Sequence, residues 1–255
     1  MGRGAENRRL DQLLVDRGLF ASRERARRAV MAGAVEVAGR RVDKPGTPVD
    51  PAAELRVVAA AEPFVSRGGR KLAAALEHFR VDPAGWRCLD VGASTGGFTD
   101  CLLQRGAARV AALDVGYGLI DDRLRRDPRV ELRERVNARH LAADAFDAPF
   151  DLVVVDVSFI SLLKVVPALV PHVAAGGLLL ALVKPQFEVG REAVGKGGIV
   201  RDETVRTGIV QERAAGLAEL GLALVGTFDS PVTGTRGNRE AFALFRRPAA
   251  AGEVA

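Results

Sequence analysis

Apolar positions in the first third of the chain follow helical spacing and then strand spacing. Leu10, Leu13 and Leu14 fall at i, i+3 and i+4, which predicts an amphipathic helix that ends at Gly18. Ser22 is placed to cap a second helix. A period-two pattern around a glycine then predicts a small hairpin. The elements predicted here are helices over residues 9–17 and 23–31, a hairpin over 34–42 and a strand over 54–58.

A different pattern begins near residue 64, where short apolar runs alternate with spacers of helix length. That alternation is typical of an α/β fold with a doubly wound parallel sheet. A long helix with one apolar face is predicted near the end, followed by two further strands. The predicted strands cover residues 88–91, 110–114, 130–136, 152–156, 178–184, 223–228 and 241–246, and the long helix covers 202–220.

The two patterns divide the chain into two domains. We predict a small α+β domain over residues 8–60, a linker over 61–65 and a Rossmann-like doubly wound α/β domain over 66–248. The small-residue-rich tail over 249–255 is expected to be disordered.

A glycine-rich turn follows the first strand of the larger domain. An acid at the strand end precedes three glycines, at the sheet edge where open α/β folds bind ligands. Glycines there let the backbone approach a ligand. The glycine spacing matches neither the G-x-G-x-x-G pattern of dinucleotide sites nor the G-K-[ST] pattern of phosphate-binding loops, so both ligand types are disfavoured. The acid before the turn instead suits a cationic ligand group, such as the amino end of S-adenosylmethionine. The alternative is a tight turn without a ligand. The residues of this turn are Asp90, Gly92, Ala93, Ser94, Thr95, Gly96, Gly97 and Phe98.

Two further polar residues end neighbouring strands. Asp114 is placed to accept hydrogen bonds from ribose hydroxyls, or it forms a turn before Gly116 and Gly118. Asn137 is placed either to hydrogen-bond an adenine edge or to form an Asx turn.

Charged residues follow two buried apolar runs on the same sheet edge. Asp156 and Lys184 each come directly after a predicted strand, where an unpaired charge is costly unless it meets solvent or has a function. Methyl transfer to a sugar hydroxyl requires removal of its proton, and a neutral lysine is able to do this. Burial or a second cation favours the neutral form of a lysine. Lys71 is a candidate second cation, and Glu240 is a candidate partner for either lysine.

Charge is distributed unevenly along the 255 residues. The sequence pI is about 9.7, and the whole excess of positive charge lies within residues 1–71. Concentrated positive charge is typical of nucleic-acid binding, although a solvated helix face is the alternative. The arginines that we assign to RNA binding are Arg9, Arg23, Arg27, Arg28 and Arg67.

Other function classes are disfavoured by composition. The longest uncharged apolar run, residues 173–183, is too short to cross a bilayer, and no signal peptide is evident. Cys88 and Cys101 are the only cysteines, which is typical of a cytoplasmic protein without disulfides. We assign no metal site.

Four of these charged residues resemble, in their order and context, the Lys-Asp-Lys-Glu tetrad of the FtsJ/RrmJ-like ribose 2′-O-methyltransferases. They are Lys71, Asp156, Lys184 and Glu240. Several segments are similar to the narrower TlyA family, whose members also carry a haemolysin label. The N-terminal pattern resembles the S-four-type RNA-binding domain of ribosomal proteins. The segments that carry these resemblances are 66–72, 155–161, 183–188 and 237–240 for the larger domain, and 9–11 and 22–26 for the smaller one.

The resemblance implies S-adenosylmethionine-dependent 2′-O-methylation of cytidines in ribosomal RNA or ribosomal subunits. It implies that Lys184 is the base, that the other three residues of the tetrad position it, and that residues 92–97 with Asp114 hold the cofactor. Ser94 and Thr95 stand where many relatives have Ala-Pro. Two alternatives are a non-enzymatic RNA-binding or ribosome-assembly factor and a membrane-active haemolysin. A pseudouridine synthase shares the N-terminal module type but has no use for the glycine turn.

Overall fold

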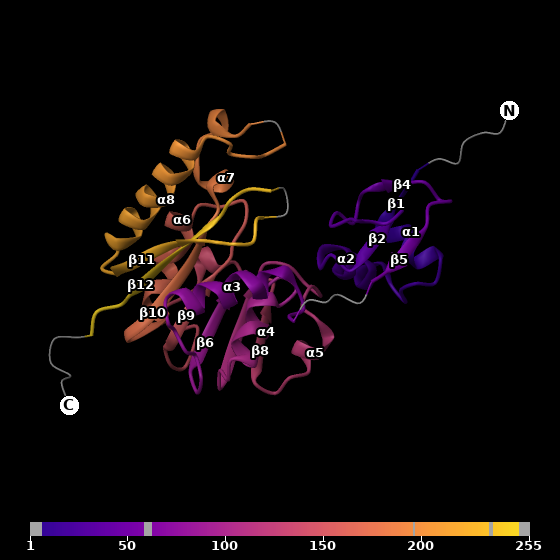
Figure 1. Ribbon diagram of the computed structural model, residues 1–255. Helices are drawn as coiled ribbons and strands as arrows, with labels where there is room; N and C mark the ends of the chain where they lie inside the picture. Colours follow the sequence, from indigo (N-terminus) through magenta and orange to yellow (C-terminus); the bar gives the residue numbers. More distant parts are fainter. Residues whose placement is uncertain (1–6, 59–62, 196, 235–236, 250–255) are drawn as a thin grey trace.

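The protein consists of a smaller N-terminal domain and a larger C-terminal domain in the computed structural model, which describes residues 7–58, 63–195, 197–234 and 237–249 (Figure 1). The predicted linker 61–65 and tail 249–255 lie partly outside these residues. In the smaller domain Ser22 Oγ accepts a hydrogen bond from Arg25 N and caps the second helix, as predicted. Its elements are β1 (Arg8–Arg9), α1 (Leu10–Asp16), α2 (Arg23–Met31), β2 (Val35–Val37), β3 (Arg40–Arg41), β4 (Pro48–Val49) and β5 (Leu55–Val57).

The larger domain is built on a seven-stranded sheet in the order β11-β12-β10-β9-β6-β7-β8. Its helices are α3 (Arg67–His78), α4 (Gly97–Gln104), α5 (Asp122–Arg125), α6 (Leu162–Leu169), α7 (Pro185–Glu188) and α8 (Glu203–Ala218), with short 3-10 turns at Ala138–His140, Val170–His172 and Arg191–Ala193. Its strands are β6 (Arg87–Val91), β7 (Arg109–Asp114), β8 (Val130–Glu134), β9 (Phe150–Val155), β10 (Val173–Val183), β11 (Ala223–Asp229) and β12 (Ala241–Arg246).

The central strands are buried on both faces. Along β9, Val153 and Val155 pack into a core with α6 and α8, whereas Leu152 and Val154 pack into a second core with α3, α4 and α5. This is the reason that the strand appears in the sequence as a continuous apolar run rather than an alternating one. The doubly wound arrangement is therefore confirmed.

One strand departs from the predicted parallel direction. β12 pairs antiparallel with both β10 and β11, so the sheet is mixed. Parallel neighbours need a long crossover that usually contains a helix, and the described residues between β11 and β12 contain none. Consequently β12 returns along the sheet in the direction opposite to β10 and β11.

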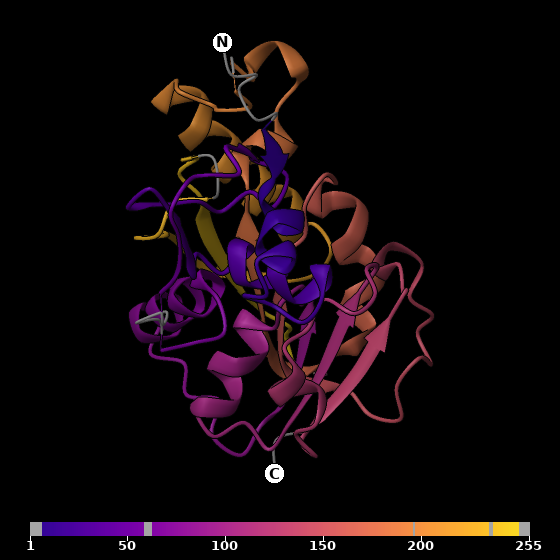
Figure 2. The ribbon, with the colours of Figure 1, turned by 90° about the vertical axis from the view of Figure 1, so that its right-hand side faces the viewer.

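Helix α2 of the smaller domain rests on the loop between β7 and α5 of the larger one. Arg28 donates hydrogen bonds to the backbone oxygens of Gly118 and Ile120, each over 3.2 Å. Arg25 and Arg28 also pair with Asp122. Figure 2 shows the smaller domain in front of the sheet edge of the larger one. These contacts place the basic domain beside the carboxyl ends of the strands.

Candidate active site

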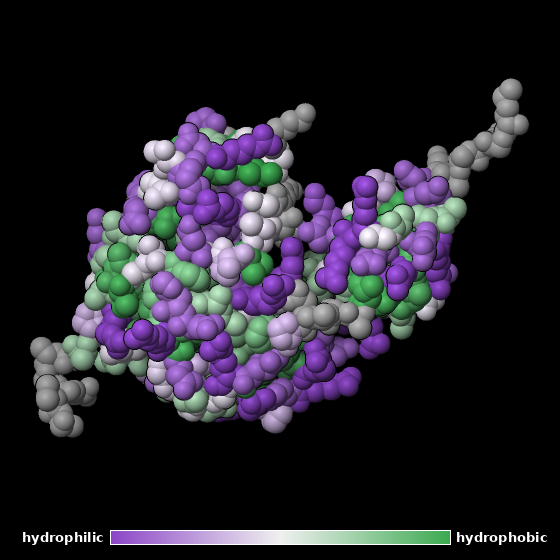
Figure 3. Space-filling model, in the orientation of Figure 1, coloured by the Kyte–Doolittle hydropathy of each residue, from purple (hydrophilic) through white to green (hydrophobic). Residues whose placement is uncertain are grey.

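Asp156 and Lys184, the charged residues that follow two strand ends, line one cavity of about 750 Å³, whereas Asp90, Asp114 and Asn137 are not among its lining residues. The glycine turn and all four residues of the predicted tetrad lie on its wall. Met31, Asp43 and Lys44 of the smaller domain complete the wall. Figure 3 shows the hollow between the two domains, with hydrophilic residues around it. The site is therefore formed jointly by both domains.

Lys184 and Asp156 form an ion pair at the ends of adjacent strands. β9 and β10 run parallel with Val155 opposite Ala181, so the residues after each strand emerge side by side. Lys184 Nζ also donates a 2.9 Å hydrogen bond to Ser158 Oγ. Both charged side chains are largely shielded from solvent, so the pairing is stronger than at an open surface.

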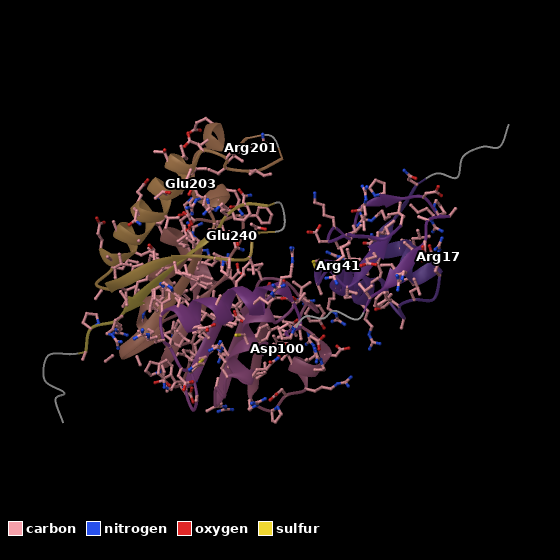
Figure 4. The ribbon with its side chains drawn as sticks, in the orientation of Figure 1. Arg17, Arg41, Asp100, Arg201, Glu203 and Glu240 are labelled. Atoms are coloured by element: carbon pink, nitrogen blue, oxygen red, sulfur yellow. The ribbon has the colours of Figure 1, made fainter. Side chains whose placement is uncertain are left out.

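Lys71 and Glu240 form a second ion pair in the same cavity. Lys71 Nζ lies 2.6 Å from Glu240 Oε2, and their side chains are only 11% and 3% exposed. Gln186 Nε2 donates a 3.4 Å hydrogen bond to Glu240 Oε1. Figure 4 shows Glu240 on the part of the larger domain that faces the smaller one. Of the two lysines, Glu240 therefore holds Lys71, and Gln186 connects this pair to the segment that carries Lys184.

The glycine turn is needed for packing within the protein. Gly92 and Gly96 have φ values of +86° and +93°, which favour glycine. A Cβ at Gly92 would collide with the backbone oxygen of Asp156, and one at Gly97 would collide with Ser66 Oγ. From the sequence we expected these glycines to make room for a ligand; at Gly92 and Gly97, neighbouring segments of the chain fill that space.

Asp90 lies fully buried beneath the glycine turn. Its Oδ2 accepts a 2.7 Å hydrogen bond from Thr99 Oγ1, whereas Oδ1 has no hydrogen-bond partner among the described residues. Burial raises the pKa of Asp90 to about 7, with the Thr99 hydrogen bond opposing the shift. A buried acidic side chain with one oxygen left unpartnered among the described residues suits a ligand with an ammonium group, so this residue fits S-adenosylmethionine.

The raised pKa of Asp90 gives a testable pH dependence. Between about pH 4 and pH 7 the unfolded chain loses this proton while the folded protein keeps it, so rising pH favours unfolding. We expect the Asp90→Asn variant to gain stability relative to the parent across this window, by up to about 4 kcal/mol. Urea unfolding of both proteins at several pH values measures the difference. A difference that stays constant with pH would contradict the assignment.

Asp114 and Asn137 both bond to the backbone. Asp114 Oδ2 accepts from Ser94 N over 2.7 Å, and Oδ1 accepts from Gly116 N over 2.6 Å. Asn137 Oδ1 accepts from Arg139 N, which is the Asx turn. Asp114 thus ties the glycine turn to the end of β7. The contact of Asp114 with ribose hydroxyls stays a prediction. The contact of Asn137 with an adenine edge stays a prediction as well.

Four of the five arginines assigned to RNA binding contact other residues of the chain. Arg9 and Arg23 both pair with the buried Asp11. Arg67 pairs with Asp43 across the two domains, and Arg28 makes the interdomain contacts already described. Arg27 is exposed. The arginines of α2 are therefore divided between contacts within the protein and exposure to solvent.

An aromatic pair beside the tetrad was missed by the sequence analysis. Phe159 is 87% exposed and has a φ of +66°, a strained value for a bulky residue. Its ring centroid lies 4.8 Å from that of Phe187, and both residues line the cavity. Ser158 and Gln186 were missed as well. The available signal was an aromatic residue three positions after the charged residue that follows each of two strands.

The fold and the site together define a Rossmann-like methyltransferase domain joined to a small RNA-binding module. The family model for FtsJ-like methyltransferases matches residues 64–247, and the model for the S4 domain matches residues 8–55. The chain belongs to the FtsJ-like methyltransferase family and carries an N-terminal S4 domain.

Several known proteins are similar over almost the whole chain. The 16S/23S rRNA (cytidine-2′-O)-methyltransferase TlyA of Mycobacterium tuberculosis is 49% identical and covers 95% of this chain and 91% of its own. The putative rRNA methyltransferase YqxC of Bacillus subtilis is 45% identical, with coverages of 92% and 84%. A solved structure described as a putative hemolysin from Streptococcus thermophilus is 40% identical, with a TM-score of 0.74 and coverages of 96% and 90%.

Proposed function

We propose that this protein transfers the methyl group of S-adenosylmethionine to the 2′-hydroxyl of a cytidine in ribosomal RNA. The observation that carries the proposal is the convergence of two ion pairs, Lys184–Asp156 and Lys71–Glu240, on the cavity that also contains the glycine turn. A ribosomal RNA substrate is supported by the S4 domain and by the printed activity of the relatives. A ribosomal RNA partner supports a cytoplasmic location for the protein.

The cofactor supplies an activated methyl group, so the protein must supply the proton acceptor. Lys184 Nζ, in its neutral form, removes the proton of the 2′-hydroxyl as the oxygen takes the methyl. Asp156 and Ser158 fix the position of Nζ and stabilise the ammonium that forms. The Lys71–Glu240 pair lies across the cavity and positions the ribose. Asp90 and the glycine turn would hold the cofactor.

RNA has to enter between the domains. Because Met31, Asp43 and Lys44 form part of the cavity wall, the target nucleotide passes beside the S4 domain. A ribose within a helix does not reach Lys184, so the nucleotide swings out of its stack. The exposed ring of Phe159 is placed to stack on the extruded base.

Removal of that ring provides a test of the stacking role. Base stacking on an aromatic side chain contributes about 1–3 kcal/mol, so we expect Phe159→Ala to lower kcat/KM by about 5- to 150-fold. The Phe159→Tyr variant keeps the ring and should retain activity. Cofactor affinity, measured by calorimetry, should be the same in both. Equal kcat/KM values for the alanine and tyrosine variants would exclude stacking at this residue.

The proposed reaction is tested by mapping 2′-O-methyl positions in ribosomal RNA treated with and without the purified protein and S-adenosylmethionine. New methylation at cytidine is the expected result. A ribosome-assembly factor without enzymatic activity would bind RNA but add no methyl group. Failure of the protein to bind S-adenosylmethionine in calorimetry would favour this alternative.

A haemolysin would release the contents of liposomes. Such leakage, caused by the purified protein free of RNA, would overturn the proposal. No helix among the described residues is long and apolar enough to span a membrane.

A further inference from the structure

A buried charged cluster lies just outside the catalytic cavity, around Glu188. Its side chain is only 2% exposed. Glu188 Oε1 accepts from Leu162 N over 2.8 Å, and Oε2 accepts from Ser161 Oγ over 2.6 Å and Arg213 Nε over 2.7 Å. Arg213 also donates to the backbone oxygen of Glu188. A buried ion pair is weak evidence for stability, because apolar residues of similar volume often stabilise a core as well. The cluster therefore calls for another explanation.

The position of Glu188 in the chain supplies that explanation. Glu188 ends α7, four residues after Lys184, and Ser161 lies five residues after Asp156. Two short segments thus run side by side, one after β9 and one after β10. They are joined at the cavity by the Lys184–Asp156 pair and at their other end by Glu188 and the N-terminus of α6.

Between these two ends lie the aromatic rings. The Phe159–Phe187 contact, at 4.8 Å between centroids, joins the same two segments midway. A bulky residue keeps a positive φ, as Phe159 does, only when its surroundings hold it there. Glu188 satisfies the backbone N–H of Leu162 and the hydroxyl of Ser161, immediately after this strained turn.

On the basis of the proposed function, we propose that Glu188, with Arg213, is a positioning residue for catalysis. It fixes the distance between the segment that carries Lys184 and the segment that carries Asp156, Ser158 and Phe159. Glu188 does not line the cavity. It acts by holding Lys184 Nζ and the Phe159 ring where the ribose and its base arrive, since a misplacement of about 1 Å in an active site costs up to roughly 100-fold in rate.

Substitution of Glu188 by glutamine tests this role. One amide –NH₂ would then face a donor, either Leu162 N–H or the Arg213 guanidinium, so the junction opens. We expect kcat to fall about 10- to 100-fold, with little change in cofactor affinity, and the pH profile of kcat to shift because Lys184 loses its fixed surroundings. The matched control is Glu212→Gln, which removes a 68% exposed partner from the same Arg213 and should change neither quantity.

A second variant separates positioning from folding. In Glu188→Gln, Arg213 loses its buried charge partner and keeps only the exposed Glu212, which by itself destabilises the fold. The double variant Glu188→Gln with Arg213→Met removes both charges and should recover thermal stability without recovering kcat. Recovery of kcat together with stability would overturn the proposal, as would a Glu188→Gln enzyme whose kcat and pH profile match the parent.

Hydrogen exchange gives a readout that does not depend on activity. The amide of Leu162 and the segment 157–161 should exchange faster in Glu188→Gln and in the double variant, but not in Glu212→Gln. Unchanged exchange would refute the junction. If the parent protein itself methylates no RNA, the proposed function fails, while this measurement still decides whether Glu188 holds the two segments together.

Discussion

We expect Lys184→Ala to lower the rate of methyl transfer by roughly 100- to 10,000-fold, the range attributed to a positioned general base. The sugar hydroxyl would then lose the proton acceptor that we assign to it, and Asp156 would lose its ion-pair partner. Because the glycine turn and Asp90 belong to other strands, cofactor affinity should be retained. Single-turnover transfer of labelled methyl to ribosomal RNA, combined with calorimetry, measures both quantities.

The Lys184→Arg variant distinguishes the base from a merely charged group. Arginine keeps the positive charge and is able to pair with Asp156, but it is not deprotonated in proteins. Its rate should therefore be as low as that of the alanine variant. The exposed Lys164 in α6 is a matched control, and Lys164→Ala should retain the parent rate. An active arginine variant would show that Lys184 acts through its charge alone.

The second large effect is expected at Gly92. An alanine there would need a φ of +86° and would place its Cβ against the backbone oxygen of Asp156. The backbone strain and the overpacking together should lower the free energy of unfolding by about 2–5 kcal/mol. The same collision would displace Asp156, so we also expect the methylation rate to fall. Urea unfolding and the transfer assay follow the two effects separately.

Gly85 provides the matched control for this substitution. Its φ is +76°, and nothing lies within 4 Å of the position that its Cβ would take. Gly85→Ala should therefore lose only the backbone component, about 1–2 kcal/mol, and keep its activity. Equal losses of stability in the two variants would show that the contact between the glycine turn and Asp156 is unimportant.

The position of the candidate site follows from the sequence because parallel strands end at one edge. Asp156 and Lys184 each follow an apolar run, and adjacency in the sheet brings them together. The role of the glycines is less accessible from the sequence. A glycine pattern shows that a Cβ is not tolerated, but it does not show whether protein or ligand fills the space.

Pairings between distant segments are the part that the sequence leaves open. Lys71 and Glu240 are 169 positions apart, and only the folded chain brings Glu240 to Lys71 as its partner. The same holds for Arg28, whose contacts on the β7–α5 loop depend on how the separate hydrophobic cores of the two domains meet. Helical and strand periods describe each element by itself, so such contacts emerge only in three dimensions.

The reversed direction of β12 has a practical consequence for handling the protein. Because Arg246 pairs with Leu178, β12 ends at the edge of the sheet opposite the cavity. In Figure 1 the yellow end of β12 accordingly lies at the far side of the larger domain from the S4 domain. An affinity tag or fluorescent label attached after residue 249 would therefore start well away from the entrance used by RNA, whereas one attached at the N-terminus would extend from the RNA-binding module itself.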